Sequence, residues 1–158
     1  MKFIEETRDL FTLPRDYLLV HCISADRAMG AGIAKVFRDK YGIRYALYVY
    51  EALTGRKWNE TDMIGKCVTV RSYQCPWCVA NLITKHNYYD KPTYETLKSA
   101  LEDLKRKIEY LNKTTPYFNK IGMPLIGCGL DRLKWDRVSG IIKDVFADAN
   151  IEIVVCRR

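Results

Sequence analysis

The chain has 158 residues, of which 48% are hydrophobic, which suits one ordinary globular domain whose core needs no disulfide bonds. No apolar run approaches the ~20 residues of a membrane-spanning helix, and the acidic start MKFIEETRD lacks the pattern of a signal peptide. We therefore expect a single cytoplasmic, monomeric domain over residues 1–158 with no membrane partner, and the net charge of +7 would suit either a polyanionic partner or simple solubility.

The first half of the chain alternates between apolar runs and amphipathic stretches. Residues 16–24 form a short, nearly continuous apolar run that predicts a strand buried on both faces. Helical stretches follow at 29–42 and 43–55, and each ends at a glycine. Residues 65–73 and 77–84 are rich in Val, Ile, Thr and aromatic residues, so we predict the two strands of a hairpin.

The second half of the chain continues this alternation. Thr93 is a good N-cap for a helix whose apolar positions fall on one face: Leu97, Leu101, Leu104, Ile108 and Leu111. Residues 117–127 predict a strand, 135–149 a helix and 151–156 a final strand. Strands that alternate with helices indicate an α/β layer architecture with a mixed, largely buried sheet.

Six cysteines are scattered through the chain, and in a cytoplasmic protein they are expected to be reduced. Cys75 and Cys78 form the motif CPWC. Redox chemistry of the thioredoxin kind needs this motif at a helix N-terminus, and a zinc site needs a second pair of ligands, which no other C-x-x-C supplies. We predict two reduced thiols at a hairpin turn and no metal site.

Two loops with paired glycines follow apolar strands. Gly30 and Gly32 lie beside a helix start in SADRAMGAGIA, and Gly127 and Gly129 precede the last helix in LIGCGLD. Backbone N–H groups left open by glycine can bind phosphate. Turns explain either loop alone, but the two together favour a pyrophosphate-bearing ligand. Neither loop has the Walker or the Rossmann spacing.

Four motifs in order give the chain a family resemblance: TRDLF, HCIS with MGAGIA, LITK with KPTYETL, and MPLIGCGLDRLKW. Together they resemble a macro domain, specifically the ADP-ribosyl-glutamate hydrolase branch typified by the terminal ADP-ribose protein glycohydrolase. The resemblance runs from about residue 8 to the C-terminus. It implies a three-layer α/β/α fold with a mixed central sheet that binds ADP-ribose at the strand ends. It also implies metal-independent hydrolysis of an ADP-ribosyl bond, with no cofactor.

The resemblance also assigns binding positions. It places Asp9 at the adenine amino group, with the backbone of Leu10 next to it, although the usual preceding glycine is Arg8 here. Ser24 matches a serine near the distal ribose. The two walls of a diphosphate cradle would be formed by Gly30, Ala31, Gly32 and Ile33 on one side and Leu125, Ile126, Gly127, Cys128, Gly129 and Leu130 on the other.

The catalytic positions implied by the resemblance are Lys85, as the nucleophile, and Asp131, as its acid/base partner. The distal ribose carbon bonded to a carboxylate has a good leaving group, so cleavage needs a positioned nucleophile and a group that moves protons. A lysine attacks only as the neutral amine. Desolvation favours that form and a neighbouring carboxylate opposes it, a balance that the sequence leaves open.

Three functions stay open at this point. The first is an enzyme that removes ADP-ribose from acidic side chains of proteins, or from thymidine or guanosine of DNA as in antitoxin and phage-defence relatives. The second is a non-catalytic ADP-ribose reader, and the third a small metal or redox protein centred on the CPWC motif. Plain interpretations also exist: Lys85 as solvated surface, Asp131 as a helix cap and His21 as a hydrogen-bonded core residue. Trp135 and the tyrosines are interpreted as core and rim packing rather than as base-stacking platforms. The tyrosines from which some would flank the cleft are Tyr45, Tyr48, Tyr50, Tyr88 and Tyr89.

Overall fold

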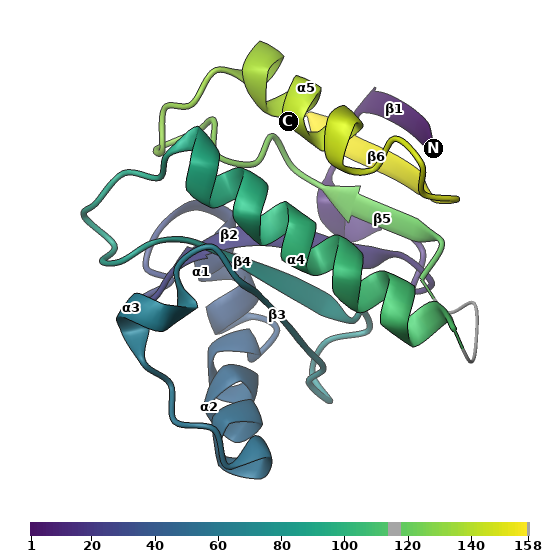
Figure 1. Cartoon of the computed structure of the whole chain (residues 1–158). Helices are drawn as coiled ribbons and strands as arrows, with labels where there is room; N and C mark the ends of the chain where they lie inside the picture. Colours follow the sequence, from purple (N-terminus) through teal and green to yellow (C-terminus); the bar gives the residue numbers. More distant parts are fainter. Residues whose placement is uncertain (114–117, 158) are drawn as a thin grey trace.

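The computed structural model describes residues 1–113 and 118–157 and shows one six-stranded sheet between two layers of helices (Figure 1). The strands are β1 (Lys2–Thr7), β2 (Leu18–Ser24), β3 (Cys67–Val70), β4 (Val79–Lys85), β5 (Lys120–Met123) and β6 (Glu152–Arg157). Their order is β1-β6-β5-β2-β4-β3, in which all neighbours are parallel except the antiparallel pair β3 and β4. The predicted mixed sheet and its hairpin are confirmed.

The helices are η1 (Leu10–Thr12), α1 (Gly32–Asp39), α2 (Ile43–Thr54), α3 (Glu60–Met63), α4 (Tyr94–Asn112) and α5 (Trp135–Val145). Thr93 caps α4 through a capping box, as its position predicts. The two faces of the sheet carry separate apolar clusters, because successive strand residues point to opposite faces. On β2, Leu18 and Val20 join the cluster under α4 and α5, whereas Leu19 and Ile23 join the one under α1 and α2. This alternation confirms the predicted three-layer α/β/α arrangement.

Several boundaries differ from the sequence-based expectations. Strand β1 was not predicted, because an edge strand with charged residues resembles an acidic tail. The one-turn helix α3 was also missed. Strand β5 covers only part of 117–127, since Pro124 follows Met123, and residue 117 lies outside the described residues. Leu111 was placed on the buried face of α4 but is 42% exposed, because it lies in the last turn, beyond the edge of the core.

One irregularity of the sheet positions the end of β4. Strands β2 and β4 pair in register from Leu19 with Val79 to Ile23 with Ile83, and then Ser24 pairs with Lys85. Thr84 is therefore an extra residue in β4.

Among the described residues no helix is long and apolar enough to cross a membrane.

Candidate functional site at the carboxyl ends of the parallel strands

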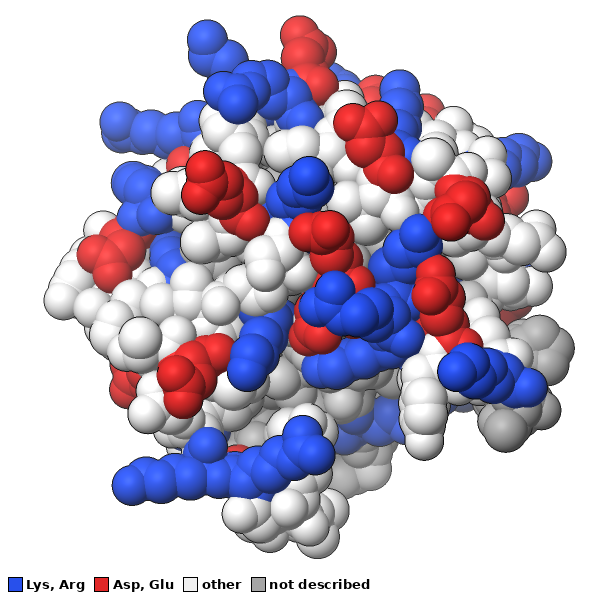
Figure 2. Space-filling view, in the orientation of Figure 1, with Lys and Arg blue, Asp and Glu red and all other residues white. Residues whose placement is uncertain are grey.

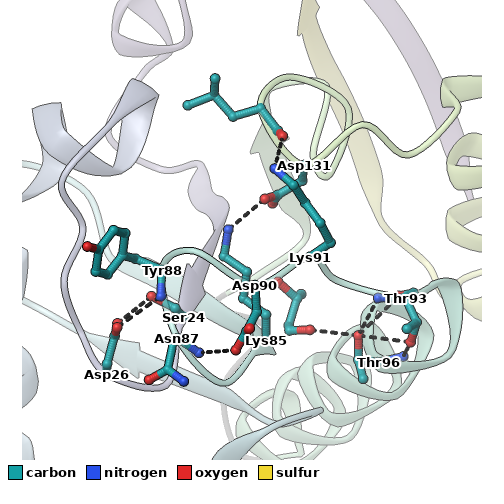
Figure 3. Close-up of polar contacts among 12 residues, drawn as sticks. Ser24, Asp26, Lys85, Asn87, Tyr88, Asp90, Lys91, Thr93, Thr96 and Asp131 are labelled. Carbon is teal, nitrogen blue, oxygen red and sulfur yellow. Dashed lines mark hydrogen bonds and ion pairs between the residues drawn. The ribbon is translucent and has the colours of Figure 1, made fainter.

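Lys85 and Asp131 meet at the carboxyl edge of the sheet (Figure 3). Lys85 is the last residue of β4, and Asp131 lies in the β5–α5 loop (residues 124–134). Strand β2 lies between β4 and β5, so the two side chains reach across the end of β2. The Lys85 Nζ donates a hydrogen bond of 2.6 Å to an Asp131 Oδ, and the two side chains are only 14% and 16% exposed.

The structure excludes two of the simpler interpretations made from the sequence, a solvated Lys85 and an Asp131 that caps a helix. Lys85 is not a solvated surface lysine, since most of its side chain is covered. Asp131 does not cap the last helix: the N-cap position of α5 is Lys134, which makes no side-chain capping bond. The third interpretation is confirmed, because His21 is fully buried and its Nε2 lies 2.6 Å from the Asn81 Oδ1.

The thiols of Cys22 and Cys128 lie near the Lys85–Asp131 pair, but neither has the lowered pKa of a reactive cysteine. Burial raises the pKa of Cys22, and the charge of Asp131 raises it further. Burial and the same carboxylate raise the pKa of Cys128 as well. Because the thiolate is the reactive form of cysteine, these shifts suppress thiol chemistry here. The groups that meet here are therefore two thiols held in their protonated form and the lysine–carboxylate pair.

The β2–α1 loop (residues 25–31) is organised by the carboxylate of Asp26. It accepts hydrogen bonds from the Ser24 hydroxyl at 2.5 Å, the Ala28 N–H at 3.0 Å and the Tyr88 N–H at 2.9 Å. Burial acts to raise the pKa of Asp26, but these hydrogen bonds outweigh it and lower the pKa. Since Tyr88 belongs to the β4–α4 loop (residues 86–93), Asp26 joins the loop after Ser24 to the loop after Lys85 (Figure 3).

Arg27 anchors the same loop from its other side. Its guanidinium carbon lies 4.1 Å from the ring centre of Tyr48 and 4.3 Å from that of Trp58, and it pairs with Glu51 at 2.9 Å. Trp58 in turn donates its ring N–H to the Ala25 carbonyl. Arg27 and Met29 both have a positive φ, of 59° and 49°. Such a backbone persists only where its surroundings impose it, as these contacts do.

The four loop glycines divide into two kinds. A Cβ added to Gly32 or Gly129 would meet no atom within 4 Å, and one added to Gly30 would only touch the end of the Arg38 side chain. These three glycines border open space, as a ligand cradle requires. Gly32 and Gly127 both have a positive φ, of 58° and 72°, but Gly127 is also crowded: a Cβ there would come within 3.0 Å of Leu133, so this glycine serves the turn itself.

The remaining positions of the predicted cradle lie along the same edge. Ala31 is exposed and precedes α1 without a side-chain cap, which leaves the first N–H groups of the helix open, and Ile33 is half-buried in its first turn. In the β5–α5 loop Ile126 is buried, Leu125 and Cys128 are half-buried and Leu130 is 67% exposed. The loop is held by its own backbone hydrogen bonds, among them one from the Leu133 N–H to the Gly127 carbonyl at 2.8 Å.

Asp9 and Leu10 follow β1, at the same edge of the sheet. The Asp9 carboxylate accepts a hydrogen bond from the Phe11 N–H at 3.0 Å and so caps η1. Leu10 is buried next to Gly122. The structure thus brings the predicted positions to one edge, from β1 to β4, without testing what each would bind.

The CPWC motif lies at the opposite end of β4. Cys75 and Cys78 are free and buried in the turn between β3 and β4, and burial raises the pKa of both. No group of three or more potential metal ligands occurs among the residues that the structure describes.

Sequence reasoning missed the residues that hold the loops together, above all Asp26 and Arg27. The one available signal for Asp26 was its place two residues beyond a buried strand. Two of its partners, Ser24 and Ala28, lie two residues away on either side, but Tyr88 lies 62 positions later, and no spacing in the sequence brings that loop to Asp26. Lys91 was also missed: its Nζ donates to the Leu130 carbonyl at 2.8 Å and so joins the β4–α4 loop to the loop of Asp131.

A mostly parallel α/β sheet with glycine loops and a lysine–carboxylate pair at the carboxyl ends of its strands belongs to the class of α/β folds in which ligands bind at that end of the sheet. Within this class, residues 20–142 match the model of the Macro domain, and the chain belongs to that family. It is 41% identical over 147 residues to "ADP-ribose glycohydrolase OARD1" of Bos taurus and 40% identical to the Homo sapiens protein of that name. Each alignment covers 93% of this chain and 86% of the relative.

Solved structures share the fold at lower identity. The macrodomain of Thermus aquaticus DarG superposes with a TM-score of 0.76 at 23% identity, covering 99% of this chain and 97% of that one. The structure titled "Thermosipho africanus DarTG in complex with ADP-ribose" gives a TM-score of 0.73 at 17% identity, over 99% of this chain and 42% of that one.

Proposed function

We propose that this protein is a metal-independent ADP-ribosyl hydrolase that removes ADP-ribose from glutamate or aspartate esters of modified proteins. The observation that carries the proposal is the Lys85–Asp131 hydrogen bond of 2.6 Å, largely shielded from solvent and flanked by the two glycine loops. The bovine and human relatives, both named ADP-ribose glycohydrolases, support it at 41% and 40% identity.

The carboxyl edge of the sheet offers the length that ADP-ribose needs. Asp9 follows β1 and Lys85 ends β4, with β6, β5 and β2 between them. At about 4.8 Å per strand, this distance is about 19 Å. In the proposal, adenine lies by Asp9 and Leu10, the diphosphate lies between Gly30–Ile33 and Leu125–Leu130, and the distal ribose lies by Ser24 with its C1 at Lys85.

The chemistry then uses the lysine and the carboxylate together. The Lys85 ammonium gives a proton to Asp131, and the freed amine attacks C1 of the distal ribose. The bond from C1 to the ester oxygen breaks, and its electron pair leaves with the carboxylate of the acceptor. The attached nitrogen releases a proton to the departing carboxylate, and Asp131 gives its own proton to the ring oxygen as the glycosylamine opens to a protonated imine on Lys85. Asp131, now ionised, takes a proton from the water that adds to the imine carbon and passes it to the nitrogen. The C–N bond then breaks, the hydroxyl proton returns to Lys85, and ADP-ribose is released.

A non-catalytic reader would need the glycine loops but would have no use for Lys85 and Asp131 in contact. The test is turnover of a protein substrate ADP-ribosylated on glutamate. We expect Lys85→Ala and Asp131→Ala to lower kcat by about a thousandfold or more while ADP-ribose affinity stays within a few-fold of wild type.

Lys98→Ala, which removes an exposed lysine of α4, serves as the matched control and should turn over normally. Wild-type protein that binds ADP-ribose and releases none would exclude the hydrolase and leave the reader.

A further inference from the structure

Helix α2 carries apolar residues on its outward side as well as on its inward side. Ile43, Ala46 and Leu47 are buried in the core. Tyr45 and Leu53, on the outward side, are 70% and 82% exposed. The outward apolar positions follow one another three or four residues apart, and we call these five residues the α2 face: Tyr45, Tyr48, Val49, Ala52 and Leu53.

The outward side of α4 has a different composition. Its exposed residues there include Glu95, Lys98, Glu102, Arg106 and Glu109, and Figure 2 shows Lys and Arg mixed with Asp and Glu over this helix. A helix that is apolar all round is normally buried on all sides, whereas α2 has the core on one side only. The apolar area of the α2 face therefore lacks the stabilisation that a covering partner would give it.

The charges around the α2 face are mainly positive. Residues 38–57 contain five basic and two acidic residues, and both acids are already paired, Asp39 with Arg38 and Glu51 with Arg27. In Figure 2, Lys and Arg lie beside uncharged surface at the lower end of the molecule, where Figure 1 places α2. The cations of this segment that pair with no carboxylate in the described part of the chain, which we call the α2 cations, are Lys40, Arg44, Arg56 and Lys57.

Arg44 brings one of these charges to the border of the α2 face. Its guanidinium carbon lies 6.0 Å from the ring centre of Tyr48. Its Nε is buried and has no hydrogen-bond partner among the described residues. The positive charge beside Tyr48 is therefore not neutralised by the described chain, which favours an anionic partner group at this border.

The α2 face adjoins the proposed site through Arg27. The Arg27 guanidinium carbon lies 4.1 Å from the ring centre of Tyr48, and Arg27 belongs to the β2–α1 loop. The neighbouring Asp26 accepts a hydrogen bond from Ser24, which stands opposite Lys85 in the sheet. A partner on the α2 face would therefore lie next to a loop of the site, where the same partner can carry the modified side chain.

Charge decides which occupant fits this surface. Lys40 precedes α2, whereas Arg56 and Lys57 follow it. A two-fold axis that paired α2 antiparallel with the α2 of a second copy would bring Lys40 of one copy towards Arg56 and Lys57 of the other, and like charges repel. An acidic amphipathic helix instead offers apolar residues to the α2 face and carboxylates to the α2 cations.

We propose that the α2 face docks an acidic, amphipathic helical segment of the protein that carries the ADP-ribosylated carboxylate. The apolar side chains of the segment lie against the α2 face, and its acidic side chains lie at the α2 cations. The inference rests on the proposed function for the modified carboxylate, and it adds that the surroundings of that residue select the acceptor. Binding of an unmodified segment does not depend on hydrolysis.

The first experiment measures binding of a fluorescently labelled, unmodified synthetic helix of about 18 residues, with leucine on one face and glutamate elsewhere, by anisotropy. We expect Tyr45→Gln/Leu53→Gln to bind it about tenfold more weakly, because the apolar contact is lost from two exposed positions that the fold does not need. Tyr110→Gln is the matched control, since Tyr110 is 72% exposed on α4.

The charge of the surface is tested separately. Arg56→Glu/Lys57→Glu should weaken binding of the same peptide about fivefold at low salt and much less at high salt, because rim charges are screened. A peptide with lysine in place of every glutamate should not bind measurably to wild type. Equally tight binding of the lysine peptide would overturn the proposal.

The second experiment compares two substrates modified on glutamate, one joined by a flexible linker to the acidic helix and one without the helix. Tyr45→Gln/Leu53→Gln should raise KM about tenfold on the first, with kcat unchanged, and should leave both constants unchanged on the second. Wild-type protein that cleaves neither substrate would refute the hydrolase, and the binding experiment would still decide the docking site.

Three further results would each overturn the docking site. They are equal KM changes on both substrates, peptide binding that the double glutamine variant leaves unchanged, and an equal effect of Tyr110→Gln. Sedimentation of the protein alone tests the competing occupant: a wild-type dimer that Tyr45→Gln/Leu53→Gln dissociates would assign the α2 face to a second copy instead.

Discussion

In the proposed function the two glycine loops form opposite walls of one site, and the structure holds them in different ways. The β2–α1 loop depends on side chains from elsewhere in the chain: Asp26 binds across to the β4–α4 loop, and Arg27 lies between Tyr48 and Trp58. The β5–α5 loop depends on its own backbone hydrogen bonds and on the positive φ of Gly127, with outside contacts from Lys85, Lys91 and Tyr94. Substitutions far away in sequence should therefore affect the first wall more, whereas the second should respond more to changes within the loop.

The largest expected difference between the walls is their response to acid. His21 of β2 packs against Phe37 of α1, the helix that follows the first wall, with ring centroids 4.2 Å apart. Burial lowers the pKa of His21 to about 4 from its usual 6.5, against the opposing effect of the Asn81 hydrogen bond. The stability due to neutral His21 is therefore complete above pH 6.5 and is lost as the pH falls towards 4, by about 3 kcal/mol in total.

Urea unfolding of wild type and His21→Gln across this range measures the effect. Glutamine stays neutral, so the wild-type advantage should shrink as the pH falls. A difference in unfolding free energy that stays constant from pH 7 to pH 4.5 would show that His21 does not titrate as expected.

Removal of the Asp26 carboxylate should break the first wall most directly. Asp26→Ala leaves three donors without their charged acceptor, so we expect the unfolding free energy to fall by about 2 kcal/mol and kcat/KM to fall with it. Asp26→Asn can keep the oxygen that accepts from Ser24 and Ala28 but places an amide group against the Tyr88 N–H. It should therefore recover about half of the stability, and chemical denaturation can compare the variants. Equal stability of Asp26→Ala and wild type would contradict the clamp.

A matched pair of glycine variants tests the second wall. Gly127→Ala should cost about 1.5 kcal/mol, because alanine disfavours a φ of 72° and its Cβ would press on Leu133. Gly129→Ala should leave the unfolding free energy unchanged, since its Cβ meets open space, and should instead weaken ADP-ribose binding. Denaturation and calorimetric titration of both variants separate these effects. Equal destabilisation by the two substitutions would argue against the distinction.

The smallest effect is expected at Trp58, which lies just before α3 and contacts Ala25 and Arg27 of the first wall. Trp58→Phe removes the hydrogen bond to the Ala25 carbonyl but keeps an aromatic face for Arg27, so we expect a loss of about 1 kcal/mol. Trp77→Phe removes a comparable ring N–H bond, to the Leu13 carbonyl, from a residue of the turn between β3 and β4. Both variants should be destabilised in thermal unfolding, but only Trp58→Phe should alter ADP-ribose binding.

Local patterns predicted most of the fold. The apolar run at 16–24 correctly predicted β2, because a strand buried on both faces is apolar along most of its length. The spacing of the leucines after Thr93 correctly predicted α4, because an amphipathic helix repeats its apolar residues every three to four positions. The edge strand β1 was not predicted, because half of its residues face solvent and it therefore has no continuous apolar run.

The site was predictable only in part. Family motifs indicated Lys85 and Asp131, but 46 positions separate them, and only the order of β4, β2 and β5 shows that they meet. Asp26 has no motif. Its role follows from hydrogen bonds to Ser24, Ala28 and Tyr88, which depend on how the loops pack.

The extra residue in β4 makes the spacing of this strand as important as its composition. Thr84 shifts Lys85 by one place against β2, so that Lys85 rather than Thr84 stands opposite Ser24. A deletion of Thr84 would preserve Lys85, Asp131, the loop residues and most of the core, yet it would change the register of β4 against β2 at the point where the lysine leaves the sheet. In a homologue that keeps both lysine and aspartate but lacks this extra residue, we expect the lysine to leave the sheet on the other face, so redesign should count positions along β4 before it changes side chains.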